Sequence, residues 1–160
     1  MRVKRRWLAV TAAALLVGSM TSTAVQAGFS LVSPDEYQSE LTARAAPGAR
    51  FVARAADFNA PTITVVMPDP KGPIQPPVNI DVRFVAAEGA TINVASLRIL
   101  YGFLKLDVTR RILDAPGVQV SPTGLKASGA QLPSGSHKLV IEIADNVGRT
   151  ARQVLEFTVK

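Results

Sequence analysis

The last part of the sequence reads Pro133-Ser-Gly-Ser-His-Lys-Leu-Val-Ile-Glu-Ile-Ala-Asp-Asn-Val-Gly-Arg-Thr-Ala-Arg-Gln-Val-Leu-Glu-Phe-Thr-Val159, and this stretch decides the fold. Apolar residues occupy alternate positions on both sides of its centre, which is the period of a β-strand with one buried face. They are Leu139, Ile141, Ile143, Leu155, Phe157 and Val159. Between them, Asp145-Asn-Val-Gly148 has the side chains of a tight turn. The stretch therefore predicts an antiparallel hairpin with one face in a hydrophobic core.

The same period of two recurs upstream of the hairpin. It is clear in four segments: Ile63, Val65 and Met67; Val78, Ile80, Val82 and Phe84; Leu97, Ile99 and Tyr101; and Leu104, Leu106 and Val108. Val118 with Val120, and Leu125 with Ala127, form a weaker pair around the turn Pro122-Thr-Gly124. No long amphipathic helix separates these segments. The pattern predicts an all-β fold, an antiparallel sandwich of about seven strands.

Two connections of the predicted sandwich have distinctive sequences. Five prolines between residues 68 and 77 cannot donate to a strand ladder, so this segment is expected to be a surface connection or a crossing between the sheets. Residues 109–113 are expected to form a single helical turn capped by Thr109.

A family resemblance rests on six pieces of this pattern. They are Pro61-Thr-Ile-Thr-Val-Val66, Val78-Asn-Ile-Asp-Val-Arg-Phe84, Ser96-Leu-Arg-Ile-Leu-Tyr-Gly102, Leu106-Asp-Val-Thr109, Leu132-Pro-Ser-Gly-Ser-His-Lys-Leu139 and Asp145-Asn-Val-Gly-Arg149. Together they resemble bacterial immunoglobulin-like (fibronectin type III-like) domains of exported proteins. The resemblance implies a sandwich over residues 61–160 that serves as a spacer, an adhesion unit or an accessory module of a larger machine. The chain departs from antibody-type domains because it has no cysteine and its one tryptophan is Trp7. Phe84, Tyr101 and Phe157 are expected to fill that space.

The first 27 residues have the pattern of a secretory signal peptide. The cationic stretch Met1-Arg-Val-Lys-Arg-Arg6 precedes the apolar run 7–17, and Val25 and Ala27 satisfy the small-residue rule for cleavage after Ala27. The run is shorter than the roughly 20 residues that a membrane-spanning helix needs, which disfavours an uncleaved anchor. Arg5-Arg6 leaves twin-arginine export open, but general secretion is favoured. We expect a periplasmic or secreted protein with no stable membrane insertion after cleavage.

The charge of the chain lies mostly in this leader. Residues 1–27 hold four of the 18 basic residues and none of the 12 acids, so the rest carries 14 basic against 12 acidic side chains, a formal charge of +2. Such a small charge, scattered along the chain, gives no cationic footprint for nucleic acid. The absence of cysteine excludes disulfides and thiolate metal sites.

Residues 28–60 are expected to form an N-terminal helical extension and a linker. Ser33-Pro34-Asp35-Glu36 combines a capping hydroxyl, a proline at the first helical position and a glutamate that reaches back to the cap. The helix is predicted to run through Tyr37, Leu41 and Arg44 and to end near Ala46, before Pro47-Gly48. Tyr37 and Leu41 form a stripe that rests on the sandwich or on a partner, or else the helix is loosely attached. Residues 47–60 read as a linker with an extended piece at Phe51-Val52.

Candidate residues for chemistry are few. His137 is the only histidine, and its place at the entrance of a strand favours packing over catalysis; a small hydrolase centred on it is the least favoured function. Metal binding by nitrogen or sulfur lacks ligands. Asp145 and Asn146, which Asp69, Asp107 or Asp114 could approach in space, leave a calcium site open, but turn preferences favour a structural role. We therefore assign no catalytic, cofactor or metal residues.

Two binding surfaces remain open on the sequence. A carbohydrate platform would have to use Tyr37, Phe51, Phe58 or Phe103. A basic surface for an anionic envelope component would combine Arg110-Arg111 with Arg44, Arg50 and Arg54, although a solvated face is the favoured reading.

The function that these observations favour is that of an exported, non-catalytic protein that contacts an envelope or extracellular protein and needs no cofactor. The alternative is a carbohydrate or cell-wall binding accessory module. The sequence leaves the partner, the oligomeric state and the strand offered for pairing open.

Overall fold

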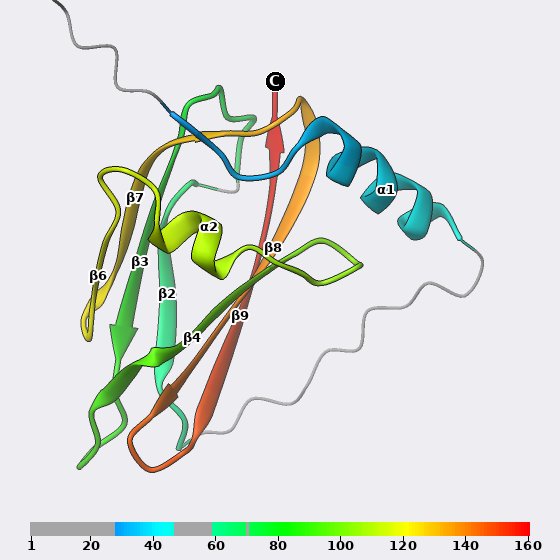
Figure 1. Cartoon of the computed structure of the whole chain (residues 1–160). Coiled ribbons are helices and arrows are strands. Elements are labelled where there is room, and N and C mark those ends of the chain that lie inside the picture. Colours follow the sequence, from blue (N-terminus) through cyan, green and yellow to red (C-terminus); the bar gives the residue numbers. More distant parts are fainter. Residues whose placement is uncertain (1–27, 47–58, 70) are drawn as a thin grey trace, which may run out of the picture.

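The computed structural model describes residues 28–46, 59–69 and 71–160. In this part of the chain, nine strands form two sheets that pack face to face (Figure 1). Sheet A contains β1 (Phe29–Ser30), β2 (Thr62–Met67), β3 (Val78–Val85), β6 (Gln119–Ser121) and β7 (Gly124–Gln131). Sheet B contains β4 (Ile92–Tyr101), β5 (Leu106–Asp107), β8 (Gly135–Asp145) and β9 (Thr150–Val159). The predicted leader and the piece at Phe51-Val52 lie outside the described residues.

The strand order is that of an immunoglobulin-like sandwich. Sheet A has the order β1-β7-β3-β2, with β6 also on β7, and sheet B has the order β5-β4-β8-β9. The seven strands β2, β3, β4, β6, β7, β8 and β9 thus take the places of A to G in the ABED and CFG sheets of that fold. The predicted all-β sandwich is confirmed. β1 is an addition that pairs in parallel with the end of β7.

The core lies between the inward faces of the two sheets, as the alternation predicts. Phe84, Tyr101 and Phe157 are buried in it. The alternation is incomplete at Val140, which is buried although it lies on the opposite face of β8. Its register partners there are Leu100 and Val154. These three residues give the outer face of sheet B a small apolar centre. Two ion pairs flank it on the same face, Lys138 with Glu156 and Arg152 with Glu142.

The proline-rich connection crosses from sheet A to the edge of sheet B. Ile74 pairs in parallel with Val159: the Ile74 amide donates to the Thr158 carbonyl at 2.8 Å, and the Lys160 amide donates to the Ile74 carbonyl at 2.9 Å. The chain then returns to sheet A as β3. Of the two arrangements predicted for this segment, the crossing between sheets is the one observed.

The predicted fourth strand is shorter than expected. Only Leu106–Asp107 pairs with β4, because Gly102 and Lys105 have positive φ values of 70° and 53° and turn the chain tightly. Leu104 consequently lies outside the core, 55% exposed. The helical turn that follows, α2 (Thr109–Leu113), begins without a side-chain cap. The predicted capping role of Thr109 is wrong, because its hydroxyl instead accepts the Ile99 amide of β4 at 2.8 Å.

The N-terminal helix α1 (Pro34–Ala45) begins with the predicted capping box. The Glu36 amide donates to the Ser33 hydroxyl at 3.2 Å, and the Ser33 amide donates to the Glu36 carboxylate at 2.8 Å. The buried face of α1 consists of Tyr37 and Glu40, whereas Leu41 is exposed, so the predicted stripe of Tyr37 and Leu41 is only half right. The helix packs on the sandwich beside the start of β8 (Figure 1). Neither described helix is long and apolar enough to span a bilayer.

Candidate functional site

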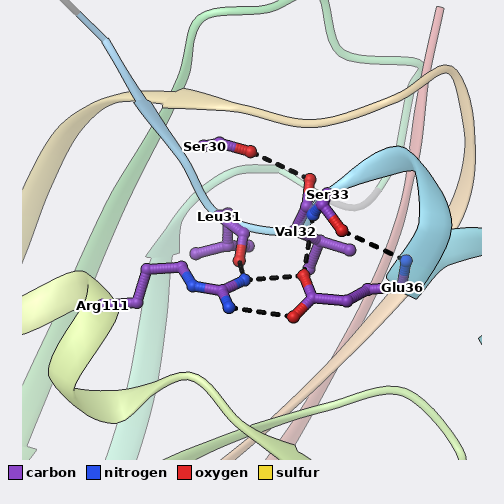
Figure 2. Close-up of polar contacts among 6 residues, drawn as sticks. All are labelled: Ser30, Leu31, Val32, Ser33, Glu36 and Arg111. Carbon is purple, nitrogen blue, oxygen red and sulfur yellow. Dashed lines mark hydrogen bonds and ion pairs between the residues drawn. The ribbon is translucent and has the colours of Figure 1, made fainter.

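The segment before α1 is fastened to the sandwich through Arg111 of α2 (Figure 2). One guanidinium nitrogen of Arg111 donates to the Leu31 carbonyl at 2.9 Å and to Glu36 Oε2 at 2.8 Å, and the other donates to Glu36 Oε1 at 2.9 Å. The hydrogen bonds from Arg111, and then that from the Ser33 amide, lower the pKa of Glu36 to about 2. Leu31 itself is fully buried. Arg111 therefore fixes the first turn of α1 on the sandwich.

His137 forms the centre of an aromatic cluster under α1. Its ring centroid lies 5.0 Å from that of Tyr37, 5.6 Å from Phe157 and 5.9 Å from Tyr101, and the residue is 2% exposed. Nε2 lies 2.8 Å from the Pro133 carbonyl, which only accepts, so Nε2 carries the proton and Nδ1 accepts from the Tyr101 hydroxyl at 2.7 Å. Burial lowers the pKa of His137. The imidazole is thus neutral, and both of its nitrogens form hydrogen bonds within the fold.

Glu40 fastens α1 to the loop between β4 and β5. Its carboxylate accepts the amides of Phe103 and Leu104, the second at 3.0 Å. The left-handed Gly102 brings these amides to the carboxylate, and a Cβ at Gly102 would overlap it. Burial, and then the charge of Glu40, raise the pKa of Tyr101. Glu40 is 5% exposed, so it serves as a buried anchor of the helix.

A cleft of about 480 Å³ opens where α1, the crossing segment and the β8–β9 ladder meet. Its cations come from three elements: Arg44 from α1, Lys71 from the crossing and Lys138 from β8. Among the described residues that line the cleft, the one acid is Glu156, whose carboxylate lies 2.5 Å from the Lys138 ammonium. The hydrogen bond from Lys138, with smaller contributions from the charges of Lys138 and Arg44, lowers the pKa of Glu156. The described lining of the cleft therefore carries a net positive charge of two, from three cations against one acid.

The edge of β9 runs into this cleft. β9 pairs with β8 over ten consecutive residues without a register shift, so it is a regular strand. On its other side, a groove of about 650 Å³ separates it from β2, which lies beside it in the other sheet. The opposite edge of sheet B is irregular, because the register of β4 shifts between Asn93 and Arg98. Among the described residues, β9 is the longest regular edge of either sheet.

Four of the five residues named as calcium candidates have separate partners in the fold, and the fifth, Asp114, is the C-cap residue of α2. The Asp145 carboxylate accepts the Val147 amide at 3.0 Å, the Arg149 amide at 2.9 Å and Arg149 Nε at 2.6 Å. Asn146 accepts the Thr91 amide at 2.9 Å. Asp69 accepts the Lys71 amide, and Asp107 pairs with Arg98. Within residues 28–46, 59–69 and 71–160, no three acids or histidines lie together as a metal site would require.

The other two predicted surfaces are divided by the fold. Tyr37 is buried against His137 and Phe103 is half-buried, whereas Phe51 and Phe58 lie outside the described residues. Of the arginines, Arg110 is exposed, Arg111 is held by Glu36 and Arg44 lines the cleft; Arg50 and Arg54 are not among the described residues. Sequence reasoning missed Lys71 and Lys138, because the cleft joins segments that are far apart in the chain and share no motif.

Comparisons with known proteins add one structural similarity. No protein-family model matches the sequence, and no curated protein matches it. Among solved structures, the crystal structure of CopC from Methylosinus trichosporium OB3b is 19% identical over 62% of this chain and 94% of that chain, with a TM-score of 0.39.

Proposed function

We propose that the protein is an exported, non-catalytic binding protein of the bacterial cell envelope, periplasmic or secreted, and that it binds an extended segment of another envelope protein along the edge of β9. Export is supported by the cationic and apolar pattern of residues 1–27. The binding role is supported by the geometry of β9.

The free edge of β9 is the observation that carries this proposal. The Ile74 amide bonds to the Thr158 carbonyl, so the backbone groups of Thr158 point away from β8. Because successive residues of a strand point to opposite sides, the backbone groups of Glu156 and Val154 also point outward, into the groove beside β2. The Val154 carbonyl accepts the Gln153 side-chain amide at 3.0 Å, so the Val154 amide and the backbone groups of Glu156 are the ones offered to a partner. Extended segments of partner proteins pair with such edges through main-chain hydrogen bonds.

The arrangement of buried ionisable groups supports a role without catalysis. His137 holds Tyr101 and Pro133, Glu40 holds the loop after β4, and Asp145 holds the β8–β9 turn. Each of these three groups is engaged by neighbours within the fold, so its hydrogen bonds serve the positions of loops and helices.

The test is site-directed photo-crosslinking in intact cells. A photoreactive residue at Thr64, which lines the groove from the β2 side and is exposed, should capture a discrete partner; the same residue at Ser128, exposed on β7, should not. Val154→Pro removes the outward amide without removing a ladder bond and should abolish capture, while Val154→Thr keeps the amide and should retain it. Capture that persists in the folded Val154→Pro protein would contradict the proposal.

A further inference from the structure

We infer that the cationic cleft at the end of the β9 edge receives a carboxylate of the bound segment, so that the partner carries an acidic residue or its own terminal carboxylate where the free edge ends. This inference rests on the proposed function and specifies the chemistry of the partner.

The free edge of β9 has a defined end, and the cleft lies there. Ile74 occupies the outer side of β9 at Val159, so an added strand has to stop before that residue. Just upstream of Ile74, Lys71, Gly72 and Pro73 form one wall of the cleft. Glu156 lines both the groove along β9 and the cleft. A segment that follows the edge from Val154 to Glu156 therefore arrives at the cleft.

The charges of the cleft select an anion. Glu156 is engaged by Lys138, which leaves two further cations, Arg44 and Lys71. In the described part of the chain, neither of these two side chains has an ion pair or a hydrogen-bonded partner. Both are exposed, and they approach the cleft from different elements. The exposed hydroxyls of Ser136 on β8 and Thr158 on β9 add hydrogen-bond donors to the cleft. Guanidinium, ammonium and hydroxyl groups all donate hydrogen bonds to carboxylate oxygens, and the first two also neutralise the carboxylate charge.

A protein carboxylate is favoured over an acidic glycan because the cleft continues a strand edge. Backbone groups that point outward along β9 match the hydrogen-bonding spacing of a peptide and not that of a sugar chain. The carboxylate at the end of the paired segment then lies in the cleft.

The test is an NMR titration of the 15N-labelled protein at low ionic strength. N-acetylglutamate N-methylamide supplies a side-chain carboxylate and N-acetylglycine a terminal one, while N-acetylglutamine N-methylamide is the uncharged control. Either carboxylate should shift the amides of Lys71, Gly72 and Ser136 in a saturable way, and the glutamine compound should not. Arg44→Ala and Lys71→Ala should each weaken binding by about twofold to fivefold, the range for exposed ion pairs. Arg83→Ala, which removes an exposed arginine on β3, should leave binding unchanged.

Three results would overturn the inference. The first is the absence of carboxylate-specific shifts at the cleft. The proposed function survives that result if Val154→Pro still abolishes crosslinking at Thr64. The second is tighter binding of glucuronate than of either peptide-like carboxylate, which would assign the cleft to an acidic glycan. The third is carboxylate binding together with crosslinking that ignores Val154→Pro, which would separate the cleft from the strand edge.

Discussion

The contact between Arg111 and Glu36 gives a quantitative prediction about how α1 is held. Replacing Arg111 with methionine removes the two hydrogen bonds to Glu36 and the donor to the buried Leu31 carbonyl, while the aliphatic part of the side chain is kept. Replacing Glu36 with glutamine removes the charge from the other side. The two variants and the double variant form a cycle that isolates the energy of the pair.

The magnitude follows from the pKa of Glu36. Its fall from 4.5 to about 2 corresponds to about 3 kcal/mol, at about 1.4 kcal/mol per pKa unit. Arg111 is 39% and Glu36 27% exposed, so solvent screens the pair, and part of the shift belongs to the Ser33 amide. We therefore expect a coupling energy of about 1.5 kcal/mol at neutral pH, with roughly 1 kcal/mol more lost in Arg111→Met for the unpaired Leu31 carbonyl.

The pH dependence of this coupling has a definite sign. The pKa of Glu36 is lower in the folded protein than in the unfolded chain, so its stabilisation is complete above about pH 4.5 and is lost as the pH falls toward 2. More than half of the coupling energy should be gone by about pH 3.

The assay is urea unfolding of the four proteins at pH 7 and pH 3, followed by circular dichroism. A coupling energy below about 0.3 kcal/mol at pH 7 would place the pair among surface contacts that contribute nothing measurable. An equal coupling energy at both pH values would refute the electrostatic reasoning even if the pair proved stabilising.

Three further predictions concern the other contacts of the sandwich. Gly102→Ala should lower the free energy of unfolding in urea by at least about 2 kcal/mol, because the new side chain combines a positive φ with overlap on the Glu40 carboxylate. The control Gly89→Ala, with a similar φ of 74° and open space around it, should lower it by about 1 kcal/mol. Equal losses of stability would contradict the role of Glu40. Burial lowers the pKa of His137, the only histidine, so the free energy of unfolding should decline as the pH falls below about 6.5. His137→Gln should flatten that decline between about pH 7.5 and 5, and an unchanged slope would contradict the role of His137. Calcium or EDTA should leave the Tm unchanged, because N–H donors surround the Asp145 carboxylate, and a calcium-dependent rise in Tm would restore the metal interpretation.

The parts of the fold that were predictable are those that depend on neighbours in sequence. The hairpin of β8 and β9 follows from alternation and from the turn at Asp145-Asn146, and α1 starts where Ser33, Pro34 and Glu36 define a capping box. Both signals lie within a few residues of the structure they specify. The sandwich then follows because alternating strands of this length have to bury one face.

The parts that were missed depend on contacts between distant segments. β1 has two residues, and its partner β7 lies about 100 positions later, so no local pattern marks it. Glu40 reads as a solvated helical glutamate until the two amides after Gly102, which are 63 and 64 positions away, are placed beside it. The cleft joins Arg44, Lys71 and Lys138 for the same reason. The edge of β9 could not be chosen from sequence because strand order is a property of the sheet.

The irregularity of β4 between Asn93 and Arg98 affects whether copies of the protein can associate edge to edge without limit. An open-ended stack of copies needs a regular edge on both sides of a sheet, since each copy has to receive a strand and to offer one. Sheet B has a regular edge at β9, but its opposite edge is bent at this shift and ends in the two-residue β5. A strand that joins β9 therefore completes the sheet. This asymmetry favours complexes of fixed stoichiometry and opposes fibrous self-association.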